Sequence, residues 1–150
     1  GADDMDIFVF LEKLNRDGER MIMNYCANKG VIHHMMPNGY SGPSTGRLRV
    51  SMRRLDETRS CEGIPEYPFD SPEPLKEGEI AEVRISIPPM GLRFHPGETL
   101  RMIISGYDFH GPSGPSKALG LAGNVIGSRH KFYFGGRYDS YLLVPVIPQK

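Results

Sequence analysis

The sequence contains no tryptophan, only two cysteines and no excess of either charge. Its 150 residues carry 18 basic and 18 acidic side chains, so the formal net charge is zero. Proteins that bind nucleic acid or an anionic membrane usually carry a basic surface, and we therefore expect neither partner here. No apolar run approaches the roughly 20 residues that a membrane-spanning helix needs.

The two cysteines, Cys26 and Cys61, are not spaced as a metal-binding knuckle. We expect two free thiols rather than a disulfide, which favours a cytoplasmic location. The histidines form no H-x-H or H-E-x-x-H pattern, and the sequence has no Walker A loop and no dinucleotide-binding loop. The sequence therefore predicts neither a metal nor another cofactor.

Glycine and proline are abundant by contrast, with 18 and 13 residues, which argues against long helices. Between these chain breakers, apolar and polar side chains alternate with the period of two that is typical of strands. Seven segments are expected to form strands, at residues 4–14, 19–26, 47–53, 79–87, 99–105, 130–134 and 141–146. Strands separated by turn signals favour an all-β sandwich, jelly roll or barrel.

Two long irregular segments interrupt these strands. Glu62–Gly78 contains four prolines, and Gly106–Ser128 contains six glycines. Loops of more than about 15 residues are unusual in a compact domain and are usually functional or docked against another part of the protein. The second begins with Tyr107-Asp108-Phe109-His110, an aromatic and polar group directly after an expected strand. Such a position often binds a ligand or another domain, although a packed loop is the simpler interpretation for an isolated chain.

The stretch Gly42-Pro43-Ser44-Thr45-Gly46 has the letters of the G-x-S-x-G nucleophile elbow. That elbow requires an apolar strand before the serine and a helix after it. Here a Pro-Asn-Gly loop precedes the motif and an expected strand follows it. We therefore interpret Ser44 as part of a surface turn and predict no catalytic residue. Arg47, Arg49 and Arg53 share one face of that strand, which favours a solvated or inter-domain face.

Taken in order, several stretches resemble a known family. They are Asp4-Met5-Asp6-Ile7-Phe8-Val9, residues 46–56, residues 74–79, Phe94-His95-Pro96-Gly97-Glu98-Thr99-Leu100-Arg101, and residues 135–148 with His130 ahead of them. This ordered set resembles the C-terminal domain of the CocE/NonD family of serine hydrolases. That family includes X-Pro dipeptidyl-peptidases, cocaine-esterase-like enzymes and α-amino-acid ester hydrolases. The resemblance implies a jelly-roll β-sandwich of the galactose-binding-like type over residues 3–148.

The same resemblance implies a function without catalysis. The family's catalytic serine, aspartate and histidine lie in an upstream α/β-hydrolase domain, and no position of this sequence matches them. The chain is then expected to pack on that catalytic domain, in the same protein or as a separate chain, and to help shape its pocket. Tyr107, Asp108, Phe109 and His110 are the candidate contact residues. The resemblance also implies one further strand before residue 4, which this sequence lacks.

Two alternatives remain open at this stage. Jelly rolls commonly bind sugars, so the chain could be a carbohydrate- or ligand-binding module, although it has no tryptophan for a sugar platform. It could also be a structural domain that forms homo-oligomers by pairing of strand edges. The substrate of the parent enzyme, whether peptide, ester or amide, is left open.

Overall fold

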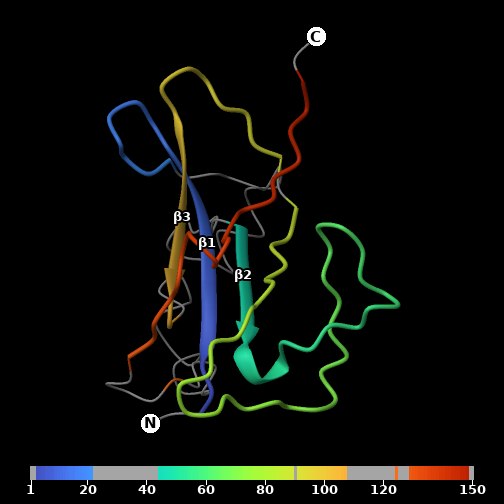
Figure 1. Cartoon of the computed structure of the whole chain (residues 1–150). Coiled ribbons are helices and arrows are strands. Elements are labelled where there is room, and N and C mark those ends of the chain that lie inside the picture. The colour runs from blue at the N-terminus through green and yellow to red at the C-terminus, as the bar shows by residue number, and fades with distance from the viewer. Residues whose placement is uncertain (1–2, 22–43, 90, 108–123, 125–128, 149–150) are drawn as a thin grey trace, which may run out of the picture.

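The computed structural model describes residues 3–21, 44–89, 91–107, 124 and 129–148. These residues form one antiparallel sheet of three strands, β1 (Asp6–Leu14), β2 (Ser44–Arg49) and β3 (Thr99–Ser105). Strand β1 lies between the other two, in the order β2-β1-β3 (Figure 1). A single 3₁₀ turn, η1 (Val50–Met52), follows β2, and the described residues contain no α-helix. The all-β class is confirmed, whereas the jelly-roll arrangement stays a prediction.

Strand β1 is the centre of the sheet because it is apolar on both faces. Ile7 and Val9 point to one face, and Phe8 and Phe10 point to the other, as expected for alternating side chains. All four are buried, and Phe10 is completely so. Burial of alternate residues on both faces shows that the strand is covered on both sides.

The face that carries Ile7 and Val9 is covered by a segment that is distant in sequence. Ile7, Val9 and Val50 form the buried cluster. Partly buried apolar side chains pack against it, namely Met5, Leu75, Val83, Ile85, Ile87 and Ile104. Leu75 belongs to the proline-rich loop at 62–78, so part of that loop packs on the core of its own domain.

Gly46 lies where the covering segment comes closest to the sheet. It pairs with Val9 across β1 and β2. A Cβ atom at this position would lie 2.7 Å from the backbone oxygen of Ser86 and 2.8 Å from Cγ2 of Ile85. Only glycine leaves enough room for this approach, so the last glycine of the G-x-S-x-G motif has a packing role.

The expected strand at 47–53 is shorter than predicted and begins earlier. β2 ends at Arg49, and Val50–Met52 turn into η1. The carboxylate of Asp4 accepts a hydrogen bond of 2.8 Å from the backbone N–H of Ser51, which draws the chain out of the strand. Apolar and polar residues therefore alternate in the sequence up to residue 53, although the backbone pairing of β2 ends at Arg49.

Three other expected strands are absent from the described sheet. Residues 79–87 form no ladder, although side chains 81–87 alternate between half-buried and exposed as predicted. The half-buried side chains of this segment pack on the face of the sheet, and its backbone does not pair with an edge strand. Residues 130–134 and 141–146 also form no strand, and most of their side chains are exposed rather than half-buried. The prediction of seven strands was wrong for these segments. Of the expected strand at 19–26, only residues 19–21 are described, and they make one β-bridge, between Arg20 and Leu14.

Two turns lie at the end of the sheet where β1 finishes and β3 starts, and the sequence signals both through Asp17-Gly18 and Pro96-Gly97. Gly18 closes the first with a φ of +79°, and Gly97 closes the second with a φ of +86°. These are conformations that glycine adopts without strain. The two turns are joined, because Nε of Arg16 donates a hydrogen bond of 2.9 Å to the carbonyl oxygen of Pro96. Nearby, the buried ammonium of Lys13 lies 2.7 Å from the carboxylate of Glu98.

Candidate inter-domain site

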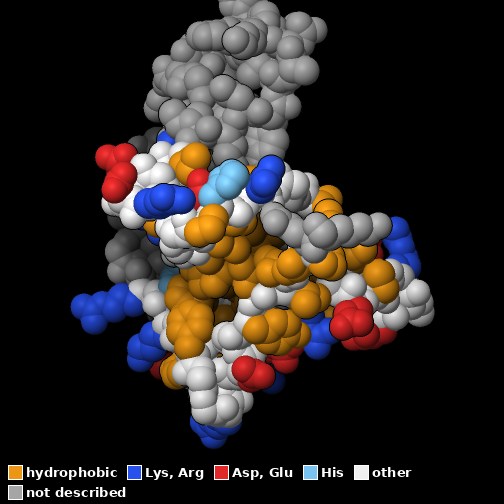
Figure 2. Space-filling view, turned by 90° about the horizontal axis from the view of Figure 1, so that it is seen from above, with side chains coloured by type: hydrophobic (Ala, Val, Ile, Leu, Met, Phe, Trp, Pro, Cys, Tyr) orange, Lys and Arg blue, Asp and Glu red, His pale blue; other side chains and the backbone are white. Residues whose placement is uncertain are grey.

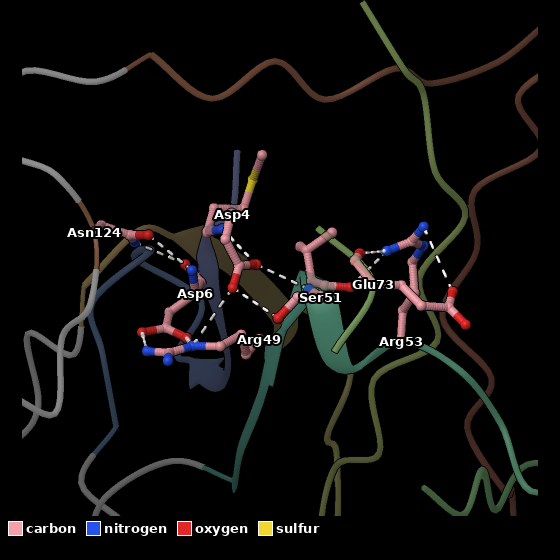
Figure 3. A network of polar contacts seen from close by, with 9 residues as sticks. Asp4, Asp6, Arg49, Ser51, Arg53, Glu73 and Asn124 are labelled. Atoms are coloured by element: carbon pink, nitrogen blue, oxygen red, sulfur yellow. Dashed lines mark hydrogen bonds and ion pairs between the residues drawn. The ribbon is translucent and has the colours of Figure 1, made fainter. Parts of the chain in front are cut away.

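The opposite end of the sheet carries Tyr107, the first of the sequence-predicted contact residues. Here β1 begins while β2 and β3 end, since Asp6 pairs with Arg49 and Phe8 pairs with Ser105. A network of polar side chains surrounds the start of β1 at this end (Figure 3). We refer to this end of the sheet, with Tyr107 shortly after β3, as the exit end.

Asp4 connects the start of β1 to η1. Its Oδ1 atom accepts hydrogen bonds from the backbone N–H groups of Met5, at 2.9 Å, and Ser51, at 2.8 Å. Its Oδ2 atom accepts a third, of 2.7 Å, from the hydroxyl of Ser51. Charged acceptors make hydrogen bonds stronger than neutral ones do. Asp4 therefore holds β1 and η1 in one fixed geometry.

Arg49 and Asp6 form a two-pronged ion pair across β1 and β2. The Nε and Nη2 atoms of Arg49 donate to the two carboxylate oxygens of Asp6 at 2.9 and 3.0 Å. The hydrogen bond with Asp6 and its negative charge raise the pKa of Arg49 above the ordinary value. The guanidinium is about half exposed, so its contribution to stability is small, and its main effect is on orientation.

Arg53 attaches the proline-rich loop to the same end. Its guanidinium donates hydrogen bonds to the carbonyl oxygens of Val50 and Glu73 and, at 3.2 Å, to the carboxylate of Glu79. The backbone N–H of Glu73 also donates a 2.7 Å hydrogen bond to the carbonyl oxygen of Ser51. Of the three arginines grouped on one predicted face, Arg49 and Arg53 therefore bind their own domain, while Arg47 is exposed.

Asn124 lies on the β3 side of the start of β1 (Figure 3). Its Oδ1 atom accepts a 2.7 Å hydrogen bond from the backbone N–H of Asp6. Its Nδ2 atom donates to the carbonyl oxygen of Asp6 at 2.8 Å and also to that of Gly106. One side chain thus links the first residue of β1 to the residue after β3. Sequence reasoning did not find Asn124, because a single asparagine in a glycine-rich loop carries no pattern.

Tyr107 leaves the sheet at this point with 62% of its surface exposed. Its backbone N–H donates a 3.2 Å hydrogen bond to the hydroxyl of Ser105. Asp108, Phe109 and His110 lie outside the described residues. His130 packs against Gly106, where a Cβ atom would come within 3.1 Å of the imidazole ring.

Large apolar side chains are exposed in several parts of the described chain. Those with more than half of their surface exposed are Ile64, Phe69, Tyr107, Phe134, Tyr141, Leu143, Val146 and Ile147. Five of the eight belong to residues 129–148, and Ile147 is 91% exposed. Figure 2 views the molecule from the end opposite the exit end. Hydrophobic side chains gather in the middle of this view, and charged side chains lie around them. Large apolar side chains that are exposed together on one surface usually mark an interaction site.

The described parts of the remaining sequence motifs can be placed on the fold. Ser44 is the first residue of β2 and pairs with Leu11, so it lies in a strand and not in the sharp strand-to-helix turn of a nucleophile elbow. Cys61 is exposed and free, whereas Cys26 lies outside the described residues. Within the described part of the chain, no group of three or more histidine, cysteine or acidic residues is arranged so that it could hold a metal ion, and no helix is long and apolar enough to cross a membrane.

Comparison with known proteins agrees with this arrangement. The model of the family described as "X-Pro dipeptidyl-peptidase C-terminal non-catalytic domain" matches residues 1–143. The chain belongs to this family. It is therefore a non-catalytic C-terminal domain, as the sequence resemblance implied. No curated protein matches the chain significantly.

Solved structures place the domain in a wider context. Two crystal structures of a CocE/NonD family hydrolase from Staphylococcus aureus match 75% of this chain at 30% sequence identity, with TM-scores of 0.60 and 0.59. The matched part is 19% of each of those chains. The domain thus spans about a fifth of the length of these hydrolases, and its resemblance to the CocE/NonD family is confirmed.

Proposed function

We propose that this chain is an accessory domain of an α/β-hydrolase that acts on X-Pro peptide bonds or on acyl ester or amide bonds. In this proposal, residues 3–148 form the domain, and the catalytic α/β-hydrolase domain belongs to the same protein or to a separate chain. The observation that carries the proposal is the family match over residues 1–143, because that family is defined by non-catalytic C-terminal domains.

The exposed apolar side chains are the proposed contact surface with the catalytic domain. Interfaces within one protein bury apolar side chains that would otherwise be in water, and aromatic residues are enriched at their centres. Tyr107 at the exit end and Tyr141 in the C-terminal segment are both large, aromatic and mostly exposed. We include Asp108, Phe109 and His110 in this surface because they follow Tyr107 directly. At this surface the domain helps to form the wall of the substrate pocket.

An activity assay tests the non-catalytic half of the proposal. The isolated chain is incubated with an X-Pro p-nitroanilide and with a p-nitrophenyl acyl ester, and the release of chromophore is followed. We expect no turnover above that of buffer, because Ser44 lies in a paired strand without an elbow. Turnover of either substrate that Ser44→Ala abolishes would overturn the proposal.

Exposed tyrosines give some support to the alternative of a carbohydrate-binding module. Sugar sites usually use flat, exposed aromatic rings, and Tyr107 meets that requirement. A glycan-array signal that Tyr107→Ala abolishes would favour this alternative. The absence of tryptophan, the commonest sugar platform, makes it the weaker of the two proposals.

A further inference from the structure

The pairing of β1 with β3 ends at Phe8 and Ser105, although β1 itself begins two residues earlier, at Asp6. Phe8 is paired with Ser105 and Phe10 with Ile103. In an antiparallel ladder, alternate residues direct their backbone groups to the same neighbour. The next pair of residues that would exchange backbone hydrogen bonds between β1 and β3 in this register is Asp6 and Tyr107. Asp6 is indeed the first residue of β1, but β3 ends at Ser105, two residues before that partner.

The side chain of Asn124 occupies the place that Tyr107 would take. Its amide offers one acceptor and one donor, as a backbone position does. The acceptor receives the N–H of Asp6 at 2.7 Å, and the donor reaches the carbonyl oxygen of Asp6 at 2.8 Å. Both backbone groups that Asp6 turns toward β3 are therefore satisfied without Tyr107.

The groups at the end of β3 are satisfied in a matching way. The carbonyl oxygen of Gly106 accepts a second hydrogen bond from Nδ2 of Asn124, and the N–H of Tyr107 donates to the hydroxyl of Ser105. A Cβ atom on Gly106 would lie 3.3 Å from Nδ2 of Asn124 and 3.1 Å from His130. The close packing of these three residues restricts the route by which the chain leaves the sheet after Gly106.

We propose that Asn124 is a positioning residue, which ends the β1–β3 ladder at Asp6 and thereby fixes where Tyr107 leaves the sheet. If the proposed function is right, Asn124 also sets the position of Tyr107 on the surface that contacts the catalytic domain, and that consequence rests on the proposed function. The placement of Tyr107 itself does not, because it concerns this chain alone.

The absence of tryptophan makes the test direct. Tyr107→Trp introduces the only indole of the chain, and its fluorescence anisotropy reports how firmly residue 107 is held. Adding Asn124→Ala is expected to lower that anisotropy, because the bonds to Asp6 and Gly106 are lost. The matched control is Asn15→Ala, since the Asn15 side chain also makes several hydrogen bonds but lies in the turn at the other end of β1. The control is expected to leave the anisotropy unchanged.

Amide hydrogen exchange gives a second readout, without any substitution at Tyr107. In Asn124→Ala, the exchange rate of the Asp6 amide relative to that of Phe10 is expected to rise about tenfold, the effect of one lost hydrogen bond. A variant that merely weakened the fold would accelerate both amides equally. Asn124→Asp keeps the shape of the side chain but turns a carboxylate toward two carbonyl oxygens, so the ratio should rise at neutral pH and recover when the carboxyl is protonated.

Several outcomes would overturn the proposal. One is an unchanged ratio of Asp6 to Phe10 exchange in Asn124→Ala, whether neither amide is accelerated or both are accelerated equally. An equal acceleration of both would indicate a general structural role. A change at Asp6 without a fall in the anisotropy of the indole at position 107 would also contradict it, because Asn124 would then support β1 without positioning residue 107. None of these measurements involves a catalytic domain, so their failure is distinct from a failure of the proposed function.

Discussion

Gly46 offers a sharp test at the scale of single residues. In Gly46→Ala, the new methyl group would meet the backbone of Ser86 and the side chain of Ile85 at less than 3 Å. Forcing an extra carbon into a packed core costs about 1–3 kcal/mol. We expect urea denaturation to show a loss of this size in the free energy of unfolding.

The control for this change is Gly91→Ala. A Cβ atom on Gly91 has nothing within 4 Å, and its backbone conformation is open to any residue. Its free energy of unfolding should therefore stay the same or rise slightly. Equal losses in the two variants would show that the segment at 85–87 does not lie against β2.

The buried carboxylate of Glu12 should make the free energy of unfolding depend on pH. Its side chain is 2% exposed and binds Arg101 and Arg20. Burial raises the pKa of this carboxyl, but the hydrogen bond and charge of Arg101, together with Arg20, outweigh that effect and lower the pKa below its ordinary 4.5. Because the folded-state pKa is the lower one, the stabilisation is complete above pH 4.5 and is lost as the pH falls through the folded-state pKa.

We therefore expect Glu12→Gln to lose about 1.5–3 kcal/mol in the free energy of unfolding at pH 7, the range for a hydrogen bond to a charged group. The difference from the unchanged protein should shrink below pH 4.5, as measured by urea denaturation at a series of pH values. Glu82→Gln is the control, because the Glu82–Arg84 pair is exposed and should contribute little. A difference that stays constant down to about pH 2, well below the ordinary range of a carboxyl pKa, would contradict this assignment.

Single residues differ in how well the sequence alone foretells their role. Gly18 and Gly97 follow turn-forming partners, and their positive φ angles were predictable from local chemistry. Asn124 contacts Asp6, 118 positions away, and no local pattern announces such a contact. Tyr107 lies just beyond a strand, as the sequence indicated, but its role in binding stays a prediction.

At the scale of secondary-structure elements, residues 81–87 provide the clearest test. They alternate in burial as a strand would, but they pack across the sheet through Val83, Ile85 and Ile87. Ile85→Ala should lower the free energy of unfolding by about 2 kcal/mol, because it removes apolar contact with the core. Glu82→Ala, on the exposed side of the same segment, should change it by less than about 0.5 kcal/mol. Equal effects of the two variants in thermal or urea unfolding would contradict this packing.

β1 and β3 were predictable from the sequence, and the other expected strands were less so. Both match the expected segments closely, because each is a mainly apolar stretch bounded by a turn, at Gly18 for β1 and at Gly97 for β3. Residues 130–134 and 141–146 are also rich in apolar and aromatic side chains but have no partner strand among the described residues. Alternation of apolar and polar residues indicates which side chains could share one face of a strand. Whether the strand pairs depends on the backbone that lies beside it.

At the scale of the whole molecule, the exposed apolar side chains are the feature that a free domain does not explain. They concentrate in residues 129–148, which the sequence predicted to be partly buried in strands. A catalytic domain packed against them would account for this exposure. We therefore expect the exposed apolar side chains of residues 129–148 to contact a catalytic domain.

Hydroxyl-radical footprinting tests that contact most directly. The oxidation of side chains is compared between this chain alone and the protein in which it follows an α/β-hydrolase domain. We predict that Tyr107, Phe134 and Tyr141 are protected from oxidation in the joined protein. The control is the half-buried Tyr67, whose hydroxyl donates a hydrogen bond to the carbonyl oxygen of Arg84, and it should be oxidised equally in both proteins. Equal oxidation of Tyr107, Phe134 and Tyr141 in the two proteins would contradict the account.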